Sequence, residues 1–294
     1  MIENSWFTYV ALTVIGLCAG SFVGATVWRF RSYLLAYDKK QGEKVDESEF
    51  KRLKKLSKKS FLTDRSVCLN CSYKLRWYDL IPIISWVSLG GKCRKCRRPI
   101  GYIEPLLEIS MALFFVISFV LWPIPMDGYL AISQFILWLL SGVILAIIFV
   151  YDLKWLEIPT ILNYSIIGLG AVNLGLVMLN SNNYLEVLTS ASIGALILSG
   201  LYLLIYFISR QRWIGFGDVL LGLGMAFLLV DWELSYLALL LANLIGCIFI
   251  IPGMLSGKLK RTSKIPFGPF LILGLVIAKL VGYKIIEVLF FSYL

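Results

Sequence analysis

The chain has 294 residues, of which 59% are hydrophobic and only 16% are charged, and its mean hydropathy is +0.81. Soluble domains are nearer half apolar and carry about 25% charge, so this composition excludes an ordinary soluble domain. The net charge of +10 would suit a nucleic-acid-binding protein. However, apolar stretches of about 20 residues, the length that crosses a bilayer, recur along the whole chain. The composition therefore predicts a multi-span membrane protein and argues against nucleic acid as a partner.

Eight apolar stretches are candidates for membrane-spanning helices. In chain order they are Trp6–Trp28, Pro105–Trp122, Leu130–Tyr151, Ile158–Leu179, Leu185–Ile208, Asp218–Val230, Leu234–Met254 and Pro266–Tyr283. The sixth stretch is short, and its Gly222 and Gly224 would permit close helix packing. We therefore expect an all-α polytopic membrane protein with about eight transmembrane helices.

The basic residues lie in alternate loops. Of the 28 lysines and arginines, 19 lie between Arg29 and Arg98, and seven more lie in the loops after the third, fifth and seventh stretches. Cytoplasmic loops carry such an excess of positive charge. With the N-terminus outside, 26 of the 28 basic residues fall on the cytoplasmic side. Because residues 1–5 contain no lysine or arginine, the first stretch is predicted to be a retained helix rather than a cleaved signal peptide.

The first cytoplasmic loop has two parts of different character. Residues 38–59 are highly charged, which predicts a solvated helix or flexible insertion, with a helix on an anionic membrane surface as the alternative. Residues 67–99 contain four cysteines and two tryptophans, which predicts a small folded module. The predicted domains are a first transmembrane helix (1–28), a cytoplasmic loop (29–104) and a transmembrane core (105–294).

Four cysteines in this loop form two CxxC pairs, Cys68 with Cys71 and Cys93 with Cys96. Zinc binds four thiolates in a tetrahedron, and each CxxC pair supplies two of them from one tight turn. The basic residues around the second pair would offset the negative charge of the thiolates. Two disulfides or four free thiols are the alternatives, and a reducing cytoplasm disfavours the disulfides. We predict a closed, structural zinc site, and we expect Cys18 and Cys247 to be ordinary buried side chains.

The chain contains no histidine, so acid–base chemistry must use carboxylates, lysine, tyrosine or cysteine. Asp152 ends the third apolar stretch, and Asp218 follows a GxG turn at the start of the sixth, so both lie at the cytoplasmic edge. A single acid there is commonly an interfacial anchor. A close pair can share one proton, so that one carboxylate activates a water while the other protonates a carbonyl oxygen. Glu108 and Glu157 are weaker candidates.

Several motifs occur together and in order along the chain. They are Gly20-Ser21-Phe22 with Arg29, the segment Arg65–Cys71, the segment Trp77–Trp86, the second CxxC pair followed by Tyr102–Glu108, Asp152-Leu153 with Ile158-Pro159, Gly215–Asp218, and Pro266–Phe270. In this order and spacing, the chain resembles the bacterial type IV prepilin peptidases, also called leader peptidase/N-methyltransferases, which are GxGD membrane aspartyl proteases.

The resemblance implies an enzyme of the bacterial inner membrane that removes the basic leader from prepilins and pseudopilins at the cytoplasmic face. It implies that Asp152 and Asp218 are the catalytic pair and that Cys68, Cys71, Cys93 and Cys96 bind zinc. It also implies methylation of the new N-terminus with S-adenosylmethionine. No residues for that cofactor are evident, because no GxGxxG segment follows a strand. The partners would be the substrate, with its apolar helix, and membrane lipid.

Three positions depart from the family pattern. Gly24 stands where asparagine is usual, Thr160 where aspartate is usual, and Leu220 where lysine is common. None of them is a candidate aspartate or cysteine, so they bear on substrate recognition and methyl transfer rather than on cleavage. Two alternatives remain open: a peptidase without methyltransferase activity, and a zinc-containing membrane scaffold without enzymatic activity.

Overall fold

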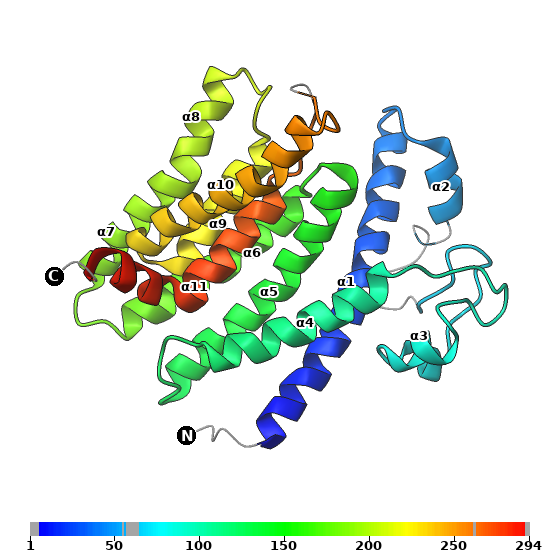
Figure 1. Cartoon of the computed structure of the whole chain (residues 1–294), viewed down its shortest axis with the longest axis horizontal. Helices are drawn as coiled ribbons and strands as arrows, with labels where there is room; N and C mark the ends of the chain where they lie inside the picture. Colours follow the sequence, from blue (N-terminus) through cyan, green and yellow to red (C-terminus); the bar gives the residue numbers. More distant parts are fainter. Residues whose placement is uncertain (1–5, 55, 57–64, 261–262, 292–294) are drawn as a thin grey trace. The chain divides into compact units, whose positions relative to one another are not determined.

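The computed structural model describes residues 6–54, 56, 65–260 and 263–291, which are mainly helical (Figure 1). Within this part of the chain, seven helical segments are long and apolar enough to cross a membrane. They are α1 (Trp6–Lys40), α4 (Ile103–Val120), α5 (Tyr129–Trp155), α6 (Thr160–Leu179), the segment α7–η2–α8 (Tyr184–Ile208), α10 (Trp232–Leu255) and α11 (Gly268–Phe291). The predicted sixth span is the shorter helix α9 (Phe216–Leu229), with 14 residues. The prediction of an all-α polytopic fold is confirmed.

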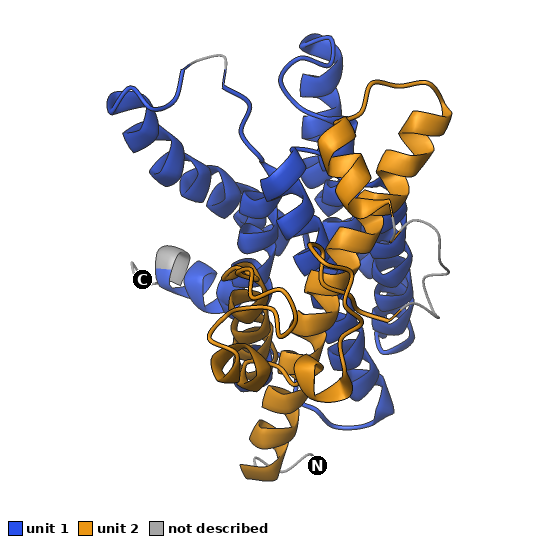
Figure 2. Cartoon of the chain, turned by 90° about the vertical axis from the view of Figure 1, so that its right-hand side faces the viewer, with its two compact units in different colours: residues 1–2, 118–294 blue, residues 3–117 orange. Residues whose placement is uncertain are grey.

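The chain forms two compact units, coloured separately in Figure 2. One comprises Glu3–Ile117, and the other comprises Met1–Ile2 with Ser118–Leu294. We call them the N-terminal unit and the C-terminal unit. The domain boundaries predicted from the sequence, at residues 28 and 104, remain a prediction.

In the N-terminal unit, α1 continues to Lys40, beyond the predicted apolar span that ends at Trp28. The polar residues beyond Trp28 extend the helix because the short helix α2 (Glu47–Leu53) packs back against it. The fully buried Leu53 accepts a hydrogen bond at its carbonyl from Ser32 Oγ, at 2.9 Å. The first part of the charged insertion is therefore an ordered helical hairpin, whereas residues 55 and 57–59 lie outside the described residues.

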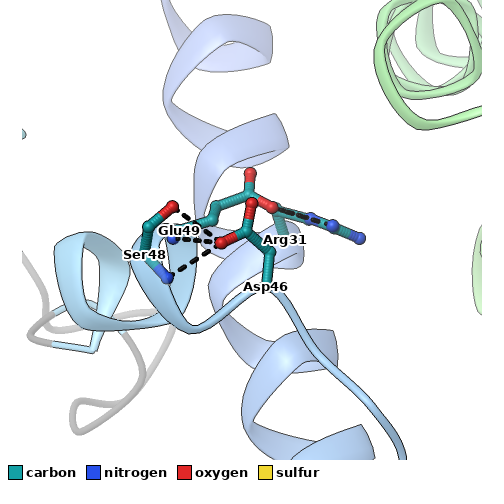
Figure 3. A network of polar contacts seen from close by, with 4 residues as sticks. All are labelled: Arg31, Asp46, Ser48 and Glu49. Carbon is teal, nitrogen blue, oxygen red and sulfur yellow. Dashed lines mark hydrogen bonds and ion pairs between the residues drawn. The ribbon is translucent and has the colours of Figure 1, made fainter.

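Polar contacts fix the start of α2 (Figure 3). Asp46 is its N-cap and accepts hydrogen bonds from the Ser48 hydroxyl and from the N–H groups of Ser48 and Glu49. These bonds hold the pKa of Asp46 below its usual value. Arg31 of α1 bonds Glu49 at 2.8 Å, which ties the first turn of α2 to α1.

Small residues allow α1 and α4 to cross closely. A Cβ atom at Gly16 would lie 2.6 Å from Ala112 Cα, and one at Gly20 would lie 2.4 Å from Glu108 Cα, both too close for any side chain. Glycines four residues apart lie on one face of a helix and allow backbones to approach in a membrane. Gly20, the glycine of the Gly-Ser-Phe motif, therefore serves helix packing.

In the C-terminal unit, α9 lies between α6 and the middle of the α7–η2–α8 segment. This segment consists of α7 (Tyr184–Ala195), a π-helical turn η2 (Leu196–Gly200) and α8 (Leu201–Ile208). A Cβ at Gly224 would lie 2.5 Å from Ile166 Cγ2, and one at Gly222 would lie 2.4 Å from the Leu198 carbonyl oxygen. The prediction that these two glycines permit close packing is confirmed.

The end of α9 is closed by polar side chains from two other helices. Asn173 Nδ2 of α6 donates to the carbonyls of Phe227 and Leu228, both at 3.2 Å, and Lys279 Nζ of α11 donates to that of Leu228, also at 3.2 Å. The last carbonyls of a helix lack partners within the helix, and lipid offers none. These side chains explain how a short apolar helix can end among longer ones.

The loops after α5, α8 and α10 emerge at the same end of the C-terminal unit, toward the top of Figure 1. These three are the loops of this unit that were predicted to be cytoplasmic. Of the seven basic residues noted above, Lys154 lies in the last turn of α5 and the other six follow α8 and α10 along the chain. Asp152 and Asp218 belong to helix ends at this side of the unit. The opposite end carries Asp231, which caps α10 through the N–H of Glu233.

Candidate active site and metal centre

The four predicted cysteines meet in one cluster. All four Sγ atoms lie within 4.8 Å of one another, and the Cys68–Cys96 and Cys71–Cys93 pairs are each 3.9 Å apart. Four sulfurs at 2.3 Å from a tetrahedral zinc lie about 3.8 Å apart. The cluster therefore has the donor atoms and nearly the spacing of a four-thiolate zinc site, and it could hold a metal ion.

The two CxxC turns are built in the same way. Cys68 N–H donates to the Tyr73 carbonyl and Cys93 N–H to the Arg98 carbonyl, both at 2.9 Å. Ser72 and Arg97, each directly after the second cysteine of its pair, both have φ of 58°. This left-handed conformation turns the chain back after each pair, where an antiparallel bridge follows, Val67 with Lys74 and Lys92 with Pro99.

The thiols of the cluster differ in acidity. Burial raises the pKa of the Cys68 thiol to about 12. Burial acts in the same direction on Cys93, but hydrogen bonds from the N–H groups of Cys96 and Lys95 and from the thiols of Cys68 and Cys96 together outweigh it and lower that pKa to about 7. A divalent cation deprotonates the thiols that coordinate it.

The two cysteines outside the cluster, Cys18 and Cys247, are exposed on α1 and α10, so the expectation that they are buried was wrong.

Two acids brace the cysteine module. Asp79, in the 3-10 helix η1 (Trp77–Leu80), accepts from Arg94 Nε at 2.8 Å and from Arg76 N–H at 3.1 Å. Glu108 of α4 accepts from the N–H of Ile83 at 2.7 Å. Ile83 has a φ of 60° and precedes helix α3 (Ile84–Ser88). The weaker candidate Glu108 is therefore a buried structural acceptor.

Asp152 lies in the last turn of α5 and is 5% exposed. Its Oδ2 accepts a hydrogen bond from the N–H of Gly268, at 3.0 Å, at the start of α11. A Cβ at Gly268 would lie 2.9 Å from the same oxygen. The glycine therefore leaves room for the carboxylate while its N–H orients it.

Asp218 lies in the first turn of α9. Its Oδ2 accepts the N–H of Gly215, the first glycine of the GxGD turn, at 3.3 Å. The carbonyl of Gly217 accepts from Nδ2 of Asn163, at 3.0 Å, and Asn163 is fully buried in α6. Two hydrogen bonds therefore fix the turn that carries Asp218. One is within the turn, from Gly215 to Asp218, and the other comes from Asn163 of α6.

The side chain of Ile158 packs against backbone near both aspartates. A Cβ at Gly217 would lie 3.1 Å from Ile158 Cβ, and a Cβ at Gly268 would lie 3.3 Å from Ile158 Cδ1. The same side chain therefore packs beside the GxGD turn and beside the glycine that bonds Asp152. The structure places the two predicted catalytic residues in one region of the C-terminal unit.

Reasoning from the sequence assigned no role to Asn163 or Gly268 in orienting the aspartates. A signal for Asn163 was present, because α6 is apolar and yet contains two asparagines, Asn163 and Asn173, both buried. Asparagine in a membrane helix commonly hydrogen-bonds a neighbouring helix. Gly268 belongs to a motif that was noted, but its partner Asp152 is 116 residues away along the chain.

Two family profiles match the chain. "Bacterial Peptidase A24 N-terminal domain" matches residues 14–122, and "Type IV leader peptidase family" matches residues 139–251. The chain belongs to the bacterial A24 family of type IV leader peptidases. It is therefore an enzyme of a peptidase family and a multi-pass membrane protein.

Relatives match over nearly their full length. The "Type 4 prepilin-like proteins leader peptide-processing enzyme" of Escherichia coli is 27% identical over 266 residues, which cover 90% of this chain and 91% of that protein. The "Prepilin leader peptidase/N-methyltransferase" of Aeromonas hydrophila is 28% identical, with 95% and 93% covered. That of Pseudomonas aeruginosa is 27% identical, with 94% and 92% covered. No solved structure matches the chain significantly.

Proposed function

We propose that this protein cleaves the basic leader from prepilins or pseudopilins, with Asp152 and Asp218 as the catalytic pair. One observation carries the proposal. Two acids from helices far apart in sequence lie in one region of a leader peptidase fold, and each is oriented by a glycine N–H, at 3.0 Å for Asp152 and at 3.3 Å for Asp218. The Gly215 contact is also the capping box that begins α9, whereas the Gly268 contact joins two helices at the carboxylate, which is the kind of orientation that acid–base catalysis needs.

The proposed chemistry uses one proton shared by the pair. The ionised carboxylate takes a proton from a water, whose oxygen attacks the scissile carbonyl carbon, while the protonated carboxyl group gives its proton to the carbonyl oxygen. The tetrahedral gem-diol then collapses: one of its hydroxyl groups gives a proton to the carboxylate that is now ionised, the C–N bond breaks, and the leaving amine takes the proton held by the other carboxyl group. Water is consumed, and the aspartates return to their initial state.

The orientation of the chain is part of the proposal. With the N-terminus outside, the cysteine module and both aspartates face the cytoplasm, and 26 of the 28 basic residues lie on that side. A substrate with an apolar helix behind a basic leader would enter from the membrane, and its scissile bond would reach the aspartates at the cytoplasmic edge. The plasma membrane of a bacterium is the proposed location.

We further propose that the protein methylates the amine exposed by cleavage. This is supported by the relatives that are named N-methyltransferases. S-adenosylmethionine would supply an electrophilic methyl carbon. The neutral amine would attack that carbon, the C–S bond would break with its electron pair going to sulfur, and the amine would release a proton to water. We also propose that the four-cysteine cluster binds zinc and that this zinc is structural, because four protein ligands leave no open position.

Asparagine variants test the peptidase assignment. Asp152→Asn and Asp218→Asn should each abolish processing of a co-expressed prepilin, since an amide cannot take or give the proton. Asp127→Asn, a change at an exposed acid outside the site, should leave processing unchanged. Full cleavage by either site variant, at wild-type protein levels, would instead support the non-enzymatic scaffold.

The mass of the processed pilin tests the methyltransferase assignment separately. We expect the mature N-terminus made by the wild-type protein to carry one added methyl group. An unmethylated N-terminus on fully processed pilin would contradict the methyltransferase assignment and would support a peptidase without methyltransferase activity.

A further inference from the structure

The N-terminal unit contains a cavity of about 350 Å³ that the proposed cleavage does not use. It lies between α1, the two CxxC turns and the first turns of α4, and Cys68 and Cys93 contribute to its wall. Sites for small organic ligands have volumes of roughly 300–1,000 Å³. The cavity is thus large enough for a nucleoside-sized molecule.

The acids that line the cavity differ in whether they have partners. Asp79 bonds Arg94, and Glu108 bonds the Ile83 N–H, so both are occupied by the fold. Glu104 is half-buried and has no hydrogen bond or ion pair within the part of the chain that the structure describes. Its carboxylate lies near Gly101, where a Cβ would be 3.7 Å from Oε2. A partly buried carboxylate without a partner favours a cationic ligand.

An aromatic wall stands beside this carboxylate. Trp86 lines the cavity, and its Nε1 donates to the Gly101 carbonyl at 2.8 Å, which fixes the indole near the backbone that adjoins Glu104. Trp28 of α1 also lines the cavity, and the Arg52 guanidinium lies over its ring, 5.4 Å from the centroid. Indole faces stack on planar bases and attract cations. Positive charge that suits a carboxylate comes from five arginines in the cavity lining, which are Arg29, Arg52, Arg65, Arg94 and Arg98.

We propose that this cavity is the binding site of the methyl donor, with Glu104 and Trp86 facing its sulfonium. S-adenosylmethionine combines a planar base, a sulfonium cation and an amino-acid carboxylate, and the cavity offers an aromatic, an anionic and a cationic group in turn. The inference rests on the proposed methyl transfer and adds the location of its cofactor.

Gly24 gives a second way to test the site. It lines the cavity, and a Cβ there would make only ordinary contacts of 3.8 Å with Glu104 and Leu107. Leucine at this position should therefore fit the helix and extend into the cavity. This glycine is also one of the departures from the family pattern, so the space it leaves is a feature of this chain.

The test is equilibrium binding to the full-length protein in lipid nanodiscs, by titration calorimetry with S-adenosylmethionine and with S-adenosylhomocysteine, which lacks the sulfonium charge. Glu104→Gln should weaken binding of the methyl donor at least tenfold and that of the uncharged analogue less than about threefold. Gly24→Leu should weaken both. Asp127→Asn is the matched control and should change neither. Equal zinc content per chain in all variants would show that the module is folded.

The outcomes separate this inference from the function on which it rests. If the wild-type protein binds the donor and the two cavity variants bind it equally well, the site is elsewhere and the proposed methyl transfer stands. An equal loss of both ligands in Glu104→Gln would overturn the placement of the sulfonium beside Glu104. If the wild-type protein binds neither ligand, the methyltransferase assignment fails together with the site.

Discussion

Each candidate aspartate depends on a backbone N–H that comes from a glycine. For Asp152 the donor is Gly268, 116 residues further along the chain, and for Asp218 it is Gly215, three residues before it. The first contact is tertiary and the second is local. The pattern of the GxGD turn can therefore be read from the sequence, whereas the part of Gly268 in the site could not be, because no periodicity or spacing relates α5 to the start of α11.

Gly268→Ala should lower cleavage strongly without unfolding the protein. The new Cβ would lie 2.9 Å from Asp152 Oδ2, so the carboxylate must move. A displacement of about 1 Å at a catalytic group can cost about 100-fold in rate. The measurement is kcat/KM for leader removal, together with the thermal unfolding midpoint.

Gly175→Ala is the matched control, because a Cβ at that helical position would have no neighbour within 4 Å. It should cleave at the wild-type rate. Equal cleavage by Gly268→Ala and the wild-type protein would mean that the Asp152–Gly268 contact does not orient the carboxylate for catalysis.

Among the elements, α9 departs most from an ordinary membrane helix. Its 14 residues are too few to span the hydrocarbon core, and its last carbonyls are bonded by Asn173 and Lys279. The sequence indicated a short segment at this place. It did not indicate which side chains would bond the last carbonyls of this helix, because Lys279 by itself could equally have extended to the membrane surface.

Lys279→Met should destabilise the protein by roughly 1–3 kcal/mol, since it removes a charged donor from a buried carbonyl while keeping a long side chain. The check is the thermal unfolding midpoint of the purified protein in detergent. Lys284→Met, an exposed change on the same helix, should have little effect. Equal midpoints for all three proteins would argue that α9 does not need this cap.

The cysteine module is the element that should depend on metal. The purified protein should contain one zinc per chain by mass spectrometry, and Cys71→Ser should lose it. Because the described module contains little regular structure besides the two CxxC turns, η1 and α3, we expect zinc removal to expose the segment 65–100 to proteolysis. The Asp152→Asn protein should keep its zinc. Full protection after chelation would contradict a structural role for the ion.

At the scale of the whole molecule, much of the fold could be predicted because each helix that crosses a bilayer needs about 20 apolar residues. Length and hydropathy located all eight apolar segments, and loop charge gave a predicted orientation. Hydropathy does not give the ends of helices: α1 continues past its apolar stretch to Lys40, where α2 packs on its polar surface through Leu53, which is a tertiary contact. The cysteine cluster was predictable because two equal spacings of a rare residue point to one chemistry.

The shortness of α9 has a consequence for the lipid around the enzyme. Fourteen residues of α-helix measure about 21 Å, whereas the hydrocarbon core is about 30 Å thick. Asp218, in the first turn of this helix, would then lie below the plane of the headgroups unless the bilayer thins locally. Hydrophobic mismatch of this kind costs free energy that depends on acyl-chain length. Leader removal should therefore be faster in nanodiscs of shorter-chain lipids at equal zinc content, and a rate independent of chain length would place Asp218 at the membrane surface.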